Sequence, residues 1–78
     1  MTKDTAKTIA KILHTVKKLQ EKFEKERDEF RSQGYFEMSE TNDAYAIGAL
    51  CAYSKILGEH LPEDGMKILE ELRKIEGE

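Results

Sequence analysis

The fold follows from residues 5–34, which read TAKTIAKILHTVKKLQEKFEKERDEFRSQG. Large apolar residues recur in this stretch at alternating intervals of three and four, a repeat of about 3.5 residues that is typical of a coiled coil. The pattern predicts one long amphipathic helix over residues 5–33 with a single apolar seam. In chain order the seam consists of Ile9, Ile12, Val16, Leu19, Phe23 and Phe30.

A glycine marks the end of this predicted helix. Gly34 follows the seam and can adopt a positive φ without steric cost, which suits the C′ position after a helix. Tyr35 then becomes C″ and Phe30 becomes C3, the two residues that contact each other in a Schellman cap. We therefore expect the helix to stop here, with the Tyr35 ring against Phe30.

A second helix is predicted over residues 40–61. Ser39 is a suitable N-cap, because its hydroxyl oxygen can accept a hydrogen bond from a backbone N–H of the first turn; Thr41 and Asn42 are alternatives. Apolar residues fall on one broad face of this helix, at the spacing expected for a buried side.

Small residues follow another side of the same helix. Ala44, Gly48 and Ala52 recur every four residues, so a second backbone can approach closely there. This interpretation makes the second helix the central one, contacted from two sides. The alternative is an exposed strip of small residues, and the spacing alone leaves both open.

A third, short helix is predicted over residues 63–76, because Pro62 cannot continue the preceding helix and an apolar stripe follows it. The fold class is therefore all-α, with a long coiled-coil-like helix, a middle helix and a short C-terminal helix in one domain over residues 1–78. At 78 residues the chain has room for no second domain.

Composition limits the class of protein. Charged residues make up 37% and hydrophobic ones 38%, and no apolar run approaches the ~18 residues of a membrane span. One cysteine excludes a disulfide scaffold and a multi-cysteine zinc site, and indicates a reducing cytoplasm. Cys51 is interpreted as a small buried hydrophobic residue. The first residues lack the apolar core of a secretory signal, so we expect a cytoplasmic protein without a membrane role.

Helix lengths favour self-association. At 1.5 Å per residue the first helix is about 42 Å long and the second about 30 Å, so the second helix cannot cover the whole seam. We expect a homodimer, in which a second copy covers the residues of the seam. A monomeric three-helix bundle, a higher oligomer and an obligate complex with another protein remain alternatives.

Charge is divided along the chain. Residues 1–33 carry nine basic and six acidic side chains, and residues 34–78 carry four and ten. A basic ridge runs along one side of the first helix, and the third helix carries a pair of carboxylates. We interpret these as candidate partner surfaces, with a merely solvated helix face as the alternative. The residues are Lys3, Lys7, Lys11, His14, Lys18, Glu70 and Glu71.

No arrangement of residues indicates catalysis. His14 and His60 lie far apart in the sequence without a second ligand at metal-binding spacing, and no glycine-rich phosphate loop is present. We therefore expect no enzyme activity, no metal and no cofactor. The expected function is a protein–protein interaction module that works as a homodimer. The alternative is a nucleic-acid-binding or architectural dimer that uses the lysines of the first helix.

One stretch carries a resemblance. Residues 35–57, where an aromatic turn leads into NDAYAIGALCAY at residues 42–53, resemble small helical proteins of phages and mobile elements. The resemblance covers about a third of the chain and includes no catalytic residue. It implies a small interaction protein that inhibits a host or defence protein.

Overall fold

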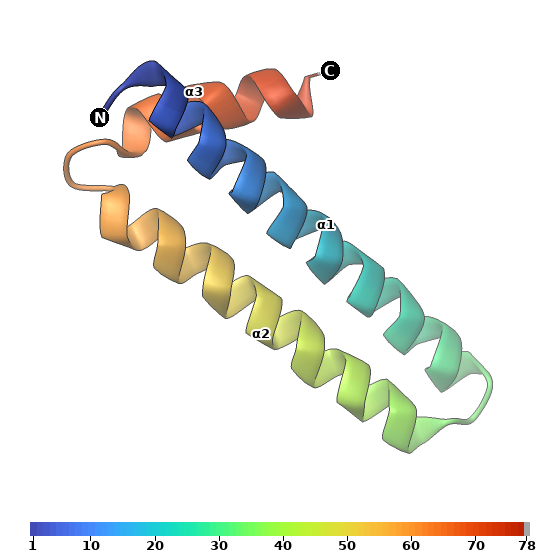
Figure 1. Cartoon of the computed structure of the whole chain (residues 1–78). Coiled ribbons are helices and arrows are strands. Elements are labelled where there is room, and N and C mark those ends of the chain that lie inside the picture. The colour runs from blue at the N-terminus through green and yellow to red at the C-terminus, as the bar shows by residue number, and fades with distance from the viewer. Residues whose placement is uncertain (78) are drawn as a thin grey trace.

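The computed structural model describes residues 1–77 and contains three helices (Figure 1). Helix α1 spans Lys3–Ser32, α2 spans Phe36–His60 and α3 spans Gly65–Glu76. Within residues 1–77 there is no strand, so the predicted all-α class with three helices is confirmed. None of these helices combines the length and the apolar character needed to cross a lipid bilayer.

Both ends of α1 are capped by local interactions. The hydroxyl oxygen of Thr2 accepts a hydrogen bond of 3.2 Å from the backbone N–H of Thr5, so the helix starts two residues earlier than predicted. At the other end Gly34 has φ +84°, and the Tyr35 N–H donates to the Phe30 carbonyl at 2.9 Å. The rings of Phe30 and Tyr35 lie 6.5 Å apart, which confirms the predicted Schellman cap.

The start of α2 differs from the prediction. The helix begins at Phe36, and the Ser39 N–H already donates to the Tyr35 carbonyl at 3.0 Å, so Ser39 lies inside the first turn. The prediction of Ser39 as the N-cap is therefore wrong. Because the Schellman turn at Gly34 already reverses the chain, α2 begins two residues after it, at Phe36, and the connection is only three residues long.

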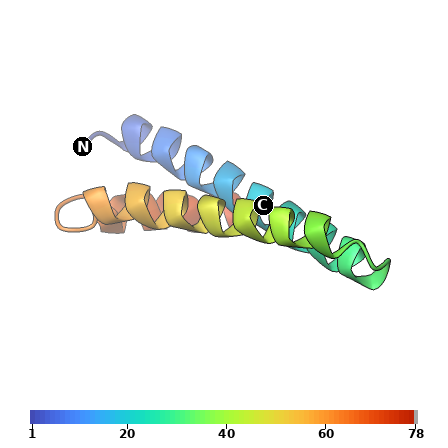
Figure 2. The ribbon, with the colours of Figure 1, turned by 90° about the horizontal axis from the view of Figure 1, so that it is seen from below.

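The helices form an antiparallel hairpin with a short third helix across one end. Helices α1 and α2 run beside each other and diverge toward the N-terminus of α1, as Figure 2 shows. Helix α3 packs on the N-terminal half of α1 and barely contacts α2. The central helix is thus α1, and the prediction of a central second helix is wrong.

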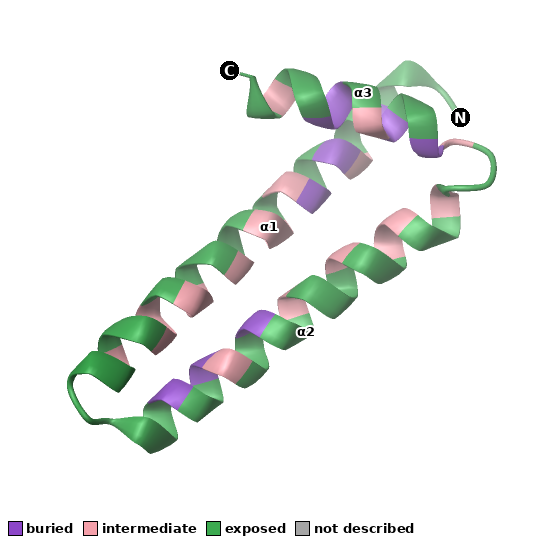
Figure 3. Ribbon diagram, turned by 180° about the vertical axis from the view of Figure 1, so that it is seen from behind, coloured by how far each residue is buried: buried purple, intermediate pink, exposed green. Residues whose placement is uncertain are grey.

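The core lies where α3 crosses α1 (Figure 3). Two alanines of α1 present so little side chain that α3 can approach closely, and this is why α1 holds two partners. The buried hydrophobic residues of this cluster are Ala6, Ala10, Leu13, Ile68 and Leu72. Toward the loop between α1 and α2 there is no third helix, and most side chains are exposed or half-buried.

The chain terminus also fixes α3. The amino group of Met1 lies 3.5 Å from a carboxylate oxygen of Asp64, and the ammonium of Lys67 donates to the Met1 carbonyl at 3.1 Å. Gly65, the first residue of α3, is buried, and a Cβ there would lie 2.8 Å from a methyl carbon of Leu61. Helix α3 starts at Gly65, two residues after the predicted start at residue 63.

Candidate interaction surface

The predicted seam of α1 is only partly used inside the chain. Ile9 packs against the core, and Val16 and the two phenylalanines are half-buried. Ile12 and Leu19 remain 48% and 43% exposed. The side of α1 that contacts α2 and α3 is centred on Leu13. Ile12 and Leu19 lie at the edge of this contact side and therefore remain accessible to solvent.

Helix α2 adds exposed apolar side chains on the same side of the hairpin as Ile12 and Leu19. The rings of Phe23 and Tyr45 lie 5.5 Å apart, which joins the two helices on this side of the hairpin. Tyr45 is 55% exposed, and Met38, two turns away on the same side of α2, is 49% exposed. We call this surface the apolar face; it consists of Ile12, Leu19, Phe23, Phe30, Met38 and Tyr45.

The middle of α2 has no charged residue over residues 44–53, which read AYAIGALCAY. A helix that is apolar around its circumference is normally buried on all sides. Here only Ala46 is buried, and Ala49 and Tyr53 are half-buried. The other seven residues are exposed, among them Cys51, whose predicted burial is therefore wrong. The small residues form an exposed strip within this chain.

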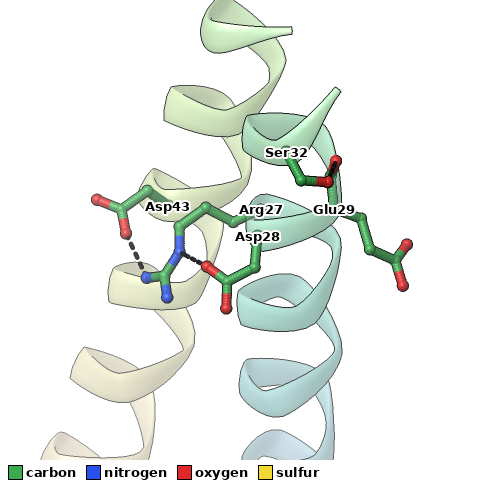
Figure 4. Close-up of polar contacts among 5 residues, drawn as sticks. All are labelled: Arg27, Asp28, Glu29, Ser32 and Asp43. Carbon is green, nitrogen blue, oxygen red and sulfur yellow. Dashed lines mark hydrogen bonds and ion pairs between the residues drawn. The ribbon is translucent and has the colours of Figure 1, made fainter. Parts of the chain in front are cut away.

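The opposite side of the hairpin carries an ion pair. The Arg27 guanidinium donates to Asp43 at 2.8 Å and to Asp28 at 3.0 Å, and so links α1 to α2 (Figure 4). The hydrogen bond that Arg27 donates to Asp43, followed by the one that it donates to Asp28, raises the pKa of Arg27. Ile47 and Leu50 lie beside this pair and are 54% and 47% exposed.

The basic ridge and the carboxylates of α3 come together in one groove. Lys3 lines a depression of about 350 Å³ between α1 and α3, and Lys7 and Lys11 line an adjoining one of about 370 Å³. The groove also contains Glu71, which is 6% exposed and accepts a hydrogen bond of 3.2 Å from Lys74. The full lining is Lys3, Ala6, Lys7, Lys11, Lys67, Glu70, Glu71, Lys74 and Ile75. The two candidate charged surfaces are thus one surface of mixed charge, which we call the lysine groove.

The remaining two residues of the ridge, His14 and Lys18, lie in a neighbouring depression of about 240 Å³. There the Lys17 ammonium donates to Glu76 of α3 at 3.0 Å, and this hydrogen bond is the main cause of the raised pKa of Lys17. Lys18 forms its own ion pair with Glu21 at 3.5 Å. The charges of this depression are therefore largely paired.

Polar groups buried between α1 and α2 were not evident from the sequence. Asn42 is 8% exposed, and its side-chain amide donates to Glu26 at 3.0 Å. Ser39 is 1% exposed, and its hydroxyl has no hydrogen-bond partner among the described residues. Ser39, Asn42, Ala46, Ala49, Tyr53 and Ile56 follow intervals of three and four, so a heptad pattern that included small and polar residues would have found the side of α2 that meets α1.

The described residues offer no metal centre, since residues 1–77 contain no group of three or more His, Cys, Asp or Glu side chains that could hold an ion. The surface of the chain is instead divided between the apolar face, the exposed middle of α2 and the lysine groove. Comparisons with protein-family models, with curated proteins and with solved structures gave no match.

Proposed function

We propose that the protein is a cytoplasmic, non-enzymatic protein–protein interaction module that works as a homodimer through the apolar face. The observation that carries the proposal is the exposure of large apolar side chains from both hairpin helices on one side, between 43% and 55% for Ile12, Leu19, Met38 and Tyr45. Contiguous exposed apolar patches of this kind mark interaction sites. The inhibitory role implied by the resemblance belongs to the same proposal, since such an inhibitor acts by presenting a surface.

The accessible surface of the chain supports a second copy as the occupant. A compact monomer of 9.0 kDa exposes about 4900 Å². This chain exposes 5539 Å². The excess, about 700 Å², is close to the ~800 Å² that each partner contributes to a stable interface of standard size. A second copy of the same flat hairpin supplies a surface of matching size and chemistry.

The apolar face is a better interface than the opposite side of the hairpin. It carries large apolar residues from both helices, including the Phe23–Tyr45 ring pair. The opposite side carries Ile47 and Leu50, with Phe36 two turns before Asp43, and these side chains lie beside the charged Arg27–Asp43 pair. Burying that ion pair against a partner would require the loss of its contact with water, which costs free energy.

The test compares two pairs of substitutions of matched exposure. The variant Ile12→Glu/Leu19→Glu places two carboxylates on the apolar face. The control Ile47→Glu/Leu50→Glu places two carboxylates on the opposite side. All four positions are between 43% and 54% exposed, so both variants should keep the monomer fold. Molar mass from light scattering and helix content from circular dichroism are measured at one protein concentration.

We expect the wild type and the Ile47→Glu/Leu50→Glu control to have twice the chain mass, and the Ile12→Glu/Leu19→Glu variant to have the mass of one chain with unchanged helix content. A wild-type protein with the mass of one chain would refute the homodimer. A dimer that survives Ile12→Glu/Leu19→Glu but dissociates with the control pair would show that the opposite side is the interface.

A second candidate function is nucleic-acid binding by the lysine groove. Lys3, Lys7 and Lys11 form ion pairs with no carboxylate of residues 1–77, and two lysines of α3 line the same groove. Phosphate-driven binding weakens steeply as salt rises. The test is titration of a labelled DNA duplex at low and high salt, with Lys7→Glu/Lys11→Glu as the variant that should lose binding; absence of binding at low salt would end this candidate.

A further inference from the structure

Charge is separated along the length of the hairpin. The contacts Phe23–Tyr45 and Arg27–Asp43 pair the end of α1 with the start of α2, so residues 19–50 form the half of the molecule that ends in the loop at Gly34. That half carries four basic and eight acidic side chains. The other half, residues 1–18 and 51–77, contains α3 and carries nine basic and seven acidic side chains.

The two possible ways of placing one apolar face on another differ in how they match these charges. With the two-fold axis along the hairpin, each acidic half lies on the acidic half of the partner. With the axis across the hairpin, each acidic half lies on the half of the partner that has no acidic excess, since residues 1–18 and 51–78 carry nine basic and eight acidic side chains in the full sequence. Opposite charges attract across an interface and like charges repel, so electrostatics favours the second arrangement.

We infer that two copies pack antiparallel through the apolar face, with the Gly34 end of one copy over the α3 end of the other. The inference rests on the proposed homodimer and specifies its partner orientation. In this arrangement α1 lies on α1 of the partner and α2 on α2, which gives a four-helix bundle of two layers, with one α3 on the outer side at each end. Nothing on the apolar face blocks this, because α3 packs on the side of α1 that carries Ala6 and Ala10.

The orientation can be tested with single spin labels that report distances between copies. In a Cys51→Ala background, Ser32→Cys labels the Gly34 end and Lys3→Cys labels the α3 end; both positions are exposed. These two positions are the first and last residues of α1, which has 30 residues. At 1.5 Å per residue it separates the two ends by roughly 40–45 Å.

The expected result is a long distance, roughly 40 Å, between two labels at residue 32 and between two labels at residue 3. A mixed dimer with one label at each position should give a distance shorter than about half of that value. Short distances between identical labels with a long mixed distance would overturn the antiparallel arrangement while leaving the homodimer intact. Light scattering of the labelled proteins separates the two ideas, since the mass of one chain would refute both.

Discussion

Ser39 is the residue at which the packing of α2 is least satisfied. Its side chain is 1% exposed, and its hydroxyl has no hydrogen-bond partner among residues 1–77. A buried polar group without a partner costs about 1–3 kcal/mol. We therefore expect Ser39→Ala to raise the free energy of unfolding by about 1 kcal/mol, as measured by urea denaturation. Ser54→Ala is the matched control, since Ser54 is an exposed serine of the same helix and reports only the change in helix propensity. Equal effects of the two substitutions would mean that the Ser39 hydroxyl is satisfied, for example by water.

Lys17 gives a prediction for alkaline pH. Its pKa lies above the ordinary value of 10.5, mainly because its ammonium donates a hydrogen bond to Glu76. A group with a raised pKa in the folded state contributes stability that is complete below the unfolded pKa and disappears as the pH passes the folded pKa. Both side chains are exposed, so the contribution is below about 1 kcal/mol. The difference in unfolding free energy between the wild type and Glu76→Gln should stay constant from pH 7 to about 10 and shrink above the ordinary lysine pKa. A difference that grows in this range would contradict the assignment of this ion pair.

Among the helices and turns, the connection between α1 and α2 depends on one backbone conformation. Gly34 has φ +84°, and a Cβ there would meet no atom within 4 Å, so any cost of a side chain comes from the backbone alone. We expect Gly34→Ala to lower the free energy of unfolding by about 1–2 kcal/mol. Gly58, inside α2 and also free of contacts at its Cβ position, serves as the control. Gly58→Ala should raise stability by roughly 0.5–1 kcal/mol, because alanine is the better helix former. Thermal and urea unfolding of both variants measure the two changes in stability. Changes of opposite sign would show that the cost at Gly34 comes from its turn conformation, and two increases would contradict this.

The sequence predicted the helices better than their partners, for a physical reason. The stop at Gly34 depends on one local conformation, and the seam of α1 depends on a regular apolar spacing, so both are visible in the sequence. Which side of α1 is buried depends instead on the approach of α3, and Ala6 and Ala10 allow that approach without adding large apolar residues to the pattern. The four-residue spacing of Ala44, Gly48 and Ala52 predicts close approach of a second backbone and hence a central α2, whereas in the single chain these three residues are exposed because α3 packs on α1.

The candidate surface was predictable only in part. Ile12 and Leu19 were identified from the heptad spacing and are exposed. Met38 and Tyr45 are not part of the predicted seam. The side of α2 that meets α1 depends on the rotation of α2, which puts Tyr45 beside Phe23, and Met38 lies in the helix because α2 starts four residues before the predicted position. Lys3 and Glu70 line the same groove because α3 packs on the start of α1. No local spacing in the sequence indicates this packing.

The shape of the whole molecule gives the last prediction. The chain measures 48 × 25 × 13 Å with a radius of gyration of 15.0 Å, whereas a compact domain of this length has about 11.5 Å. A compact particle with twice as many residues has a radius of gyration of about 15 Å. Two flat hairpins stacked face to face should therefore have nearly the same radius of gyration as one hairpin. Small-angle X-ray scattering of the wild type should therefore give twice 9.0 kDa with a radius of gyration close to 15.0 Å. The Ile12→Glu/Leu19→Glu variant should give half that mass at almost the same radius. Two hairpins joined end to end would have a much larger radius at the doubled mass, so a large increase in radius would place the contact at the ends of the molecule and not on the apolar face.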